Sequence, residues 1–184
     1  MVLGYTFVLG GARSGKSSFA EQLALRISEI YAMNVTYVAT AQVSDDEMQE
    51  RIQRHRSGRP SQWETAEIPL NVSYWLQTER APQVILIDCL SLLLNNWMFL
   101  DGCDEEQVFA RIDALVAAMA ETEHRVIVVS NEVGQGIVPG DGVSRRYRDW
   151  LGVMNQKTAQ CAEKVIWVVA GIPVDLRKLQ VSLP

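Results

Sequence analysis

Apolar residues fall along the chain in two alternating patterns. Short runs of four to six residues, rich in valine and isoleucine, have the length and composition of strands buried on both faces of a sheet. We predict such strands at Tyr5–Leu9, Val35–Thr40, Val84–Ile87, Val126–Val129 and Val165–Val169.

Longer stretches between these runs repeat their apolar residues every three or four positions, as amphipathic helices do. They predict helices over Ser17–Ile30, Asp104–Thr122 and Ser144–Glu163. Asp104 and Gln107 have the spacing of a capping box, and Ser144 is the expected cap of the third helix. Strands that alternate with helices predict an α/β fold with a parallel sheet, and ligands bind such sheets at the carboxyl ends of the strands.

Composition narrows the class of protein. The 184 residues fit one domain, 1–184, and contain neither repeats nor a linker. The formal net charge of −5 argues against a nucleic-acid partner. We expect no membrane insertion, since no apolar run approaches the roughly 20 residues that span a bilayer. Three dispersed cysteines and the lack of a signal-peptide pattern favour a reducing cytoplasm.

The first predicted strand leads directly into a glycine-rich segment, Gly10-Gly11-Ala12-Arg13-Ser14-Gly15-Lys16-Ser17, and a helix follows. This strand–loop–helix context is the one that a phosphate-binding loop requires. The glycines let successive backbone N–H groups face phosphate oxygens, Lys16 would reach the β- and γ-phosphates, and the Ser17 hydroxyl would ligate Mg²⁺. The sequence therefore predicts a P-loop NTPase-like domain with a mainly parallel sheet flanked by helices.

Two acidic residues follow later strands. Asp88 ends the run Val84–Ile87, where a carboxylate can support Mg²⁺ directly or through water, although an aspartate there can also serve as a turn or helix cap. Glu132 follows the strand at Val126–Val129, where it could orient a nucleophile or simply face solvent.

A basic helix is predicted from Ser44 to Pro60. Ser44 and Glu47 form a second capping box, and Glu47, Arg51 and His55 share one helix face. Four arginines surround the histidine: Arg51, Arg54, Arg56 and Arg59. They could neutralise a triphosphate and keep the imidazole uncharged and nucleophilic, or they could form a solvated surface. The other histidine, His124, is expected in a loop.

Several further segments complete a pattern that extends over most of the chain. They are Tyr37-Val38-Ala39-Thr40, Asp45-Asp46-Glu47-Met48, Arg51-Ile52 with His55, Arg59-Pro60, Trp63 with Thr65 and Glu67, the string from Asn131 to Pro139, and Asn155-Gln156. Together with the phosphate loop, they resemble the bifunctional adenosylcobinamide kinase/adenosylcobinamide-phosphate guanylyltransferase family of cobalamin biosynthesis.

The resemblance implies two reactions on one corrinoid. ATP or GTP phosphorylates a hydroxyl of adenosylcobinamide, and GMP then passes from GTP to that phosphate through a histidine–GMP intermediate. It implies His55 as the nucleophile, with Lys16 and Glu132 also catalytic, Mg²⁺ as the cofactor and a homotrimer. Beyond the phosphate loop, it implies nucleotide contacts at Ala39, Thr40, Ala41, Arg56, Ser57, Gly58, Arg59, Glu67 and Asp88.

Two other functions remain open from the residues alone. A P-loop kinase of another small molecule would use the basic helix only to hold phosphates. A GTP-binding regulatory module is the second, although the chain lacks an Asn-Lys-x-Asp tetrapeptide that reads guanine.

Overall fold

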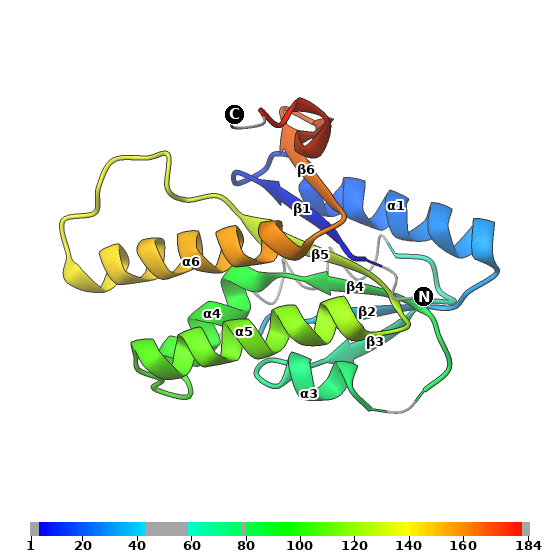
Figure 1. The fold of residues 1–184 in the computed structure, drawn as a ribbon, viewed down its shortest axis with the longest axis horizontal. Coiled ribbons are helices and arrows are strands. Elements are labelled where there is room, and N and C mark those ends of the chain that lie inside the picture. Colours follow the sequence, from blue (N-terminus) through cyan, green and yellow to red (C-terminus); the bar gives the residue numbers. More distant parts are fainter. Residues whose placement is uncertain (1–3, 43–58, 79, 182–184) are drawn as a thin grey trace.

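A computed structural model describes residues 4–42, 59–78 and 80–181 of the protein. In this part of the chain, a sheet of seven strands has the order β3-β2-β4-β5-β1-β6-β7 (Figure 1). The strands are β1 (Thr6–Gly10), β2 (Val35–Ala39), β3 (Glu64–Glu67), β4 (Val84–Asp88), β5 (Arg125–Asn131), β6 (Lys164–Val169) and β7 (Ile172–Asp175). Only the pairing of β6 with β7 is antiparallel.

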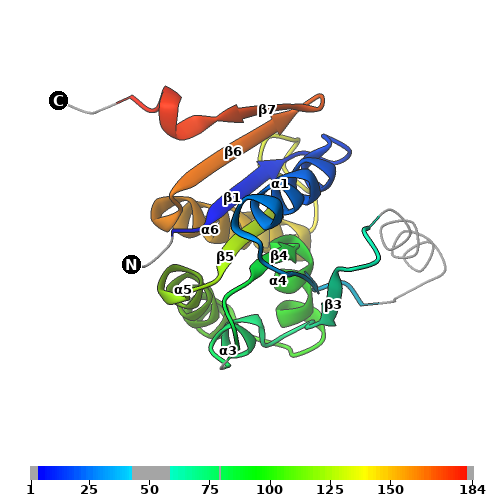
Figure 2. The ribbon, with the colours of Figure 1, turned by 90° about the vertical axis from the view of Figure 1, so that its right-hand side faces the viewer.

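Helices cover both faces of the sheet (Figures 1 and 2). They are α1 (Lys16–Tyr31), α3 (Val72–Leu76), α4 (Leu90–Phe99), α5 (Glu105–Glu121) and α6 (Gly142–Cys161), with a 3₁₀ turn at Leu176–Leu179. Side chains alternate along each strand, so Val8 packs toward Ala20 and Ala24 of α1, whereas Phe7 packs in the core under α4, α5 and α6. The predicted α/β fold with a mainly parallel, helix-flanked sheet is confirmed.

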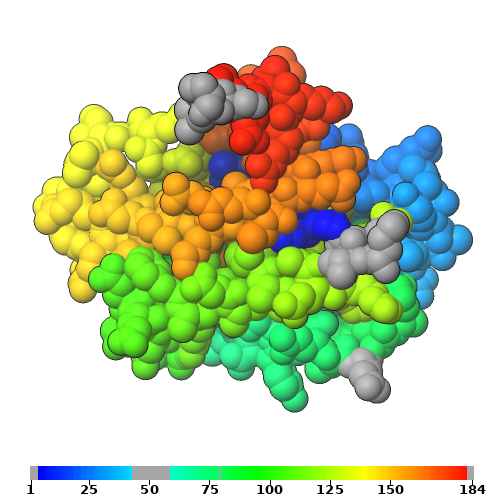
Figure 3. Space-filling view, viewed as in Figure 1, coloured from blue at the N-terminus to red at the C-terminus, as the bar shows by residue number. Residues whose placement is uncertain are grey.

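Helices α5 and α6 lie side by side on the face shown in Figure 3. Phe109 of α5 meets Trp150 of α6 edge to face, with ring centroids 6.3 Å apart. No helix among the described residues is long and apolar enough to cross a membrane.

The sequence pattern did not predict four elements of the described structure. Strand β3 has the sequence Glu-Thr-Ala-Glu and is mostly exposed, so it lacks an apolar run. Strand β7 lies at the other edge and was missed for a different reason, since it has only four residues and Pro173 interrupts its strand pattern. Helix α4 is apolar on nearly all sides and shows no helical period, and α3 has only five residues.

The predicted cap of α6 was wrong. Asp141 is the N-cap, and its carboxylate accepts a hydrogen bond from the Ser144 backbone N–H at 2.8 Å. Ser144 therefore lies inside the first turn, because the aspartate three residues earlier already satisfies its N–H group. The predicted helix beginning at Ser44 falls almost entirely on residues 43–58, outside the described part of the chain.

The capping box of α5 is confirmed and supports a stability prediction. Asp104 Oδ1 accepts from the Gln107 N–H at 2.9 Å, and Gln107 Oε1 accepts from the Asp104 N–H at 3.0 Å. We expect Asp104→Ala to lower the free energy of unfolding by about 1 kcal/mol in urea titrations. Asp149→Ala, at an exposed position inside α6, is the control and should change it by less than about 0.5 kcal/mol. Equal effects of the two variants would contradict this assignment.

Candidate active site

The segment between β1 and α1 has the geometry of a phosphate loop. Gly15 caps the helix with a φ of 93°, a left-handed conformation that favours glycine. A Cβ at Gly10 would lie 2.5 Å from Ser14 Oγ and 2.6 Å from the Val168 carbonyl oxygen, so only glycine fits there. Lys16 is 8% exposed and its Nζ donates to the Gly11 carbonyl at 3.1 Å, which folds the side chain back over the loop.

The turn between β6 and β7 supports this loop from behind. The Gly171 N–H donates to the Ser14 carbonyl at 2.8 Å, and the Gly171 Cα would lie 3.3 Å from a Cβ at Gly15. Sequence reasoning missed this support because the turn is more than 150 residues away along the chain. The positive φ of Gly171, 81°, marks this turn, but it is a property of the folded backbone and cannot be read from the sequence.

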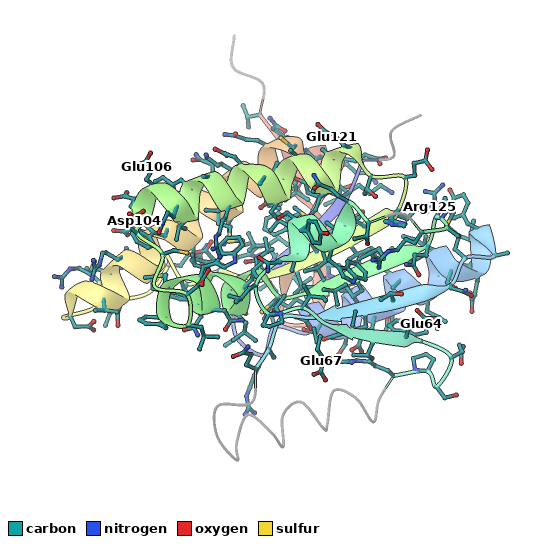
Figure 4. All side chains as sticks on the ribbon, turned by 90° about the horizontal axis from the view of Figure 1, so that it is seen from below. Glu64, Glu67, Asp104, Glu106, Glu121 and Arg125 are labelled. Carbon is teal, nitrogen blue, oxygen red and sulfur yellow. The ribbon has the colours of Figure 1, made fainter. Side chains whose placement is uncertain are left out.

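The parallel register brings the other predicted residues to the same edge of the sheet. Ala39 pairs with Glu67 on one side and with Asp88 on the other, and Gly10 pairs with Asn131. Figure 4 shows Glu67 and Glu64 at opposite ends of β3. Glu132 follows β5, and its N–H donates to the Gly10 carbonyl at 3.1 Å. The phosphate loop, Asp88, Glu67 and Glu132 therefore meet at the carboxyl ends of the strands.

A polar network ties the end of β5 to two helices. The Asn131 side-chain amide donates to Ser91 Oγ at 2.6 Å, and the Tyr147 hydroxyl donates to the Ser91 carbonyl at 3.0 Å. The Asn155 amide donates to the Asn131 carbonyl at 3.0 Å. These bonds fix β5 against α4 and α6 just before Glu132, whose carboxylate accepts from the Gly134 N–H.

Thr40 is fully buried, and its hydroxyl forms hydrogen bonds with backbone groups. It donates to the Cys89 carbonyl and accepts from the Cys89 N–H, each at 2.8 Å. The Thr40 N–H also donates to the Asp88 carbonyl at 3.2 Å. The residue thus ties β2 to the beginning of α4 and holds the backbone on both sides of Asp88.

Asp88 belongs to a half-buried cluster of charged and aromatic residues. Its Oδ2 accepts a hydrogen bond from the Tyr37 hydroxyl at 2.8 Å. The Arg59 guanidinium lies over the Tyr37 ring, 3.3 Å from Cζ to the ring centroid. Burial raises the pKa of the Glu21 carboxyl, which is then lowered by the positive charge of Arg59 and raised by the negative charge of Asp88. Glu21 and Tyr37 were not predicted as site residues. Glu21 lies in the helix after the phosphate loop, outside the motif, and Tyr37 lies in an apolar run that predicts a buried strand.

Four predicted site residues lie outside the described part of the chain: His55, Arg56, Ser57 and Gly58. Arg59 is the first described residue after them. His124 lies in a loop, as predicted, away from this edge, and is 4% exposed. Its Nδ1 accepts from the Gln83 N–H at 3.3 Å, and burial lowers its pKa below the usual 6.5, so it fits a neutral structural role.

The donor set at the loop fits Mg²⁺. The Ser17 hydroxyl and the Asp88 carboxylate supply oxygen atoms, and Mg²⁺ usually takes one or two protein ligands and completes its shell with water and phosphate. Among the described residues, no group of three or more histidine, cysteine or acidic side chains is arranged to hold a metal.

Comparisons with a family model and with known proteins point to the same family. The model of a family described as cobinamide kinase / cobinamide phosphate guanyltransferase matches residues 6–176. The chain is 43% identical over 171 residues to the bifunctional adenosylcobalamin biosynthesis protein CobP of Pseudomonas aeruginosa, covering 92% of this chain and 95% of that protein. It is 39% identical to the bifunctional adenosylcobalamin biosynthesis protein CobU of Salmonella typhimurium, covering 92% and 98%.

The fold, but not the sequence, is also similar to that of a more distant protein. The flagellar accessory protein FlaH of Methanocaldococcus jannaschii superimposes with a TM-score of 0.50 at 16% identity, over 92% of this chain and 74% of that chain.

Proposed function

Because the chain belongs to the cobinamide kinase / cobinamide phosphate guanyltransferase family, we propose that its one phosphate loop serves two reactions in turn. The enzyme phosphorylates adenosylcobinamide with a nucleoside triphosphate and transfers GMP from GTP to the adenosylcobinamide phosphate. The observation that carries the shared site is the single loop, with Lys16 folded over it and Asp88 and Glu132 at the same sheet edge. We propose that residues 1–184 form one nucleotide-binding domain.

In the kinase step, the loop amides and Lys16 hold the triphosphate and withdraw charge from it. A corrinoid hydroxyl oxygen forms a bond to the γ-phosphorus while the bond to the β-phosphate oxygen breaks. We assign Glu132 to orient that hydroxyl and take its proton. Its place beside Gly10 and its hydrogen bond from Gly134 support the assignment.

In the transferase step, we assign His55 as the nucleophile. A neutral imidazole nitrogen bonds to the α-phosphorus of GTP as the bond to pyrophosphate breaks, which leaves a phosphoramidate. A phosphate oxygen of the corrinoid then displaces the histidine, and the imidazole is regenerated. Two displacements suit a bulky acceptor, because pyrophosphate can leave before the corrinoid phosphate binds beside the histidine-bound GMP.

We propose nucleotide contacts at Ala39, Ala41, Arg59, Glu67 and the residues Arg56, Ser57 and Gly58, with Thr40 acting through its backbone. Ser17 and Asp88 would hold Mg²⁺, which supplies charge neutralisation on the phosphates. The neighbouring positions of Ala39, Glu67 and Asp88 across β2, β3 and β4 support a common binding edge.

The metal assignment leads to a prediction for Asp88→Asn. It should raise the Mg²⁺ concentration for half-maximal activity severalfold, with a smaller effect on nucleotide affinity, because a neutral amide supports Mg²⁺ less well. Magnesium titrations of both reactions measure this. Asp113→Asn in α5, on the opposite face of the sheet from α1, is the control and should leave the midpoint unchanged. An unchanged midpoint in Asp88→Asn would reduce Asp88 to a structural residue.

We also propose a homotrimer in the cytoplasm. The loop after β5 leaves Ile137 97% exposed and Val138 61% exposed, and such apolar side chains suit contact with another subunit. All three cysteines are unpaired thiols, which suits a reducing compartment. Sedimentation equilibrium measures the mass, and a monomer would contradict the assembly.

The experiment that tests the overall function uses GTP labelled at the α-phosphate, with and without adenosylcobinamide phosphate. Label should appear on the protein alone and then move to the corrinoid product. Phosphorylation of a corrinoid without any labelled protein would instead favour direct transfer, and phosphorylation of a different small molecule would favour a plain kinase.

A further inference from the structure

Tyr37 is buried in β2, and both its hydroxyl and one face of its ring contact residues of the proposed site. It is 3% exposed, and its hydroxyl donates to Asp88 Oδ2 at 2.8 Å. The hydroxyl is the donor in this bond, because an ionised carboxylate can only accept. One oxygen of Asp88 is therefore held in a fixed direction.

The flat face of the same ring holds Arg59. The guanidinium carbon lies 3.3 Å from the ring centroid, which is the arrangement of a cation stacked on an aromatic face. Among the described residues, no ion pair within 4.0 Å joins Arg59 to Asp88 or to Glu21, although both carboxylates influence the cluster. The buried Nε of Arg59 also has no hydrogen-bond partner there.

Arg59 and Asp88 carry opposite charges that both act on Glu21, yet they form no ion pair with each other within 4.0 Å in the described part of the chain. Without the ring, Arg59 and Asp88 could form a bidentate pair, which would occupy the guanidinium N–H groups and both carboxylate oxygens. The stacked ring instead keeps the guanidinium edge available to phosphate and leaves one carboxylate oxygen for a metal.

We infer that Tyr37 is a positioning residue that keeps Arg59 and Asp88 apart, so that one binds nucleotide phosphate and the other supports Mg²⁺. The inference rests on the proposed function for the roles of Arg59 and Asp88. The ring separates the two charges, and the hydroxyl orients the carboxylate.

The test measures equilibrium binding of GTP in EDTA, which requires no metal and no catalysis. Tyr37→Leu should weaken metal-free binding about tenfold, because Arg59 then pairs with Asp88. Tyr37→Phe keeps the ring and should stay within about twofold of the parent. Adding Asp88→Asn should improve binding at least about threefold more in the Tyr37→Leu background than in the parent, since it releases Arg59. Equal improvement in both backgrounds would overturn the inference, because a purely structural loss would not be rescued by Asp88→Asn.

A second measurement covers a Tyr37→Leu variant that does not fold. Titration of the GTP complex with Mn²⁺, followed by electron paramagnetic resonance, should show about fivefold weaker metal binding in Tyr37→Phe, because Asp88 loses its hydroxyl donor. Unchanged Mn²⁺ affinity would overturn the role of the hydroxyl. Arg59→Ala is the control for the premise: unchanged GTP affinity in that variant would remove the inference together with the nucleotide assignment of Arg59. Failure of covalent labelling at His55 would leave it intact.

Discussion

His55→Ala should abolish the covalent transfer of label from α-labelled GTP to the protein that we expect of the parent enzyme in the absence of corrinoid. A neutral imidazole can form a phosphoramidate, and His55 is the one residue that we assign to this step. The bond should be labile in acid and stable in base, because protonation of the ring nitrogen makes imidazole a good leaving group. Label from γ-labelled GTP should not remain on the protein through this route.

The matched control is His124→Ala. His124 is the other histidine, and it is buried at a loop far along the chain with its Nδ1 bonded to the Gln83 N–H. This variant should label like the parent if it folds. Guanylyl transfer should vanish in His55→Ala, whereas corrinoid phosphorylation should persist in part, since attack on a γ-phosphate needs no covalent carrier. Full transferase activity in His55→Ala would show that the mechanism is wrong and would favour direct transfer.

Lys16→Ala should slow both reactions by a factor that corresponds to about 2–4 kcal/mol of lost transition-state stabilisation. The side chain is buried over the phosphate loop, with its Nζ donating to the Gly11 carbonyl, so its charge lies where the β- and γ-phosphates would bind. The measurement is kcat/KM for corrinoid phosphorylation and for guanylyl transfer, each in the same preparation.

The control for Lys16→Ala is Lys178→Ala, which removes a lysine side chain that is 81% exposed beyond β7. It should leave both rates within about twofold of the parent. If Lys16→Ala changed both reactions by less than threefold, the assignment of Lys16 would fail. A loss confined to one reaction would contradict a single phosphate loop serving both.

The phosphate loop was predictable because its chemistry is local. Eight consecutive residues carry the glycines, the lysine and the hydroxyl, and the helix after them adds its N-terminal dipole. The five central strands were predictable for a related reason, since strands buried on both faces need unbroken apolar runs. The capping box at Asp104 is local as well and was confirmed.

Elements at the edge of the sheet were not predictable in this way. Strand β3 is mostly exposed and carries two glutamates in four residues, so nothing in its pattern separates it from a loop. It forms because β2 offers an unpaired backbone edge, and parallel hydrogen bonds from Thr36 to Ala39 complete it. Helix α4 has the opposite problem, because every residue from 90 to 98 is buried or half-buried and its apolar residues therefore do not mark a single helix face.

The sequence by itself determined that the chain is an α/β protein with a phosphate loop, and its ordered motifs indicated the family. Only the tertiary structure decided which distant residues join that loop. Strand β5 lies between β4 and β1, which sets Glu132 beside Gly10, and the turn at Gly171 braces Ser14. Tyr37 and Asp88 are 51 residues apart and share a hydrogen bond. Such contacts depend on strand order and register, which packing of the whole core selects, and no short window of sequence contains that information.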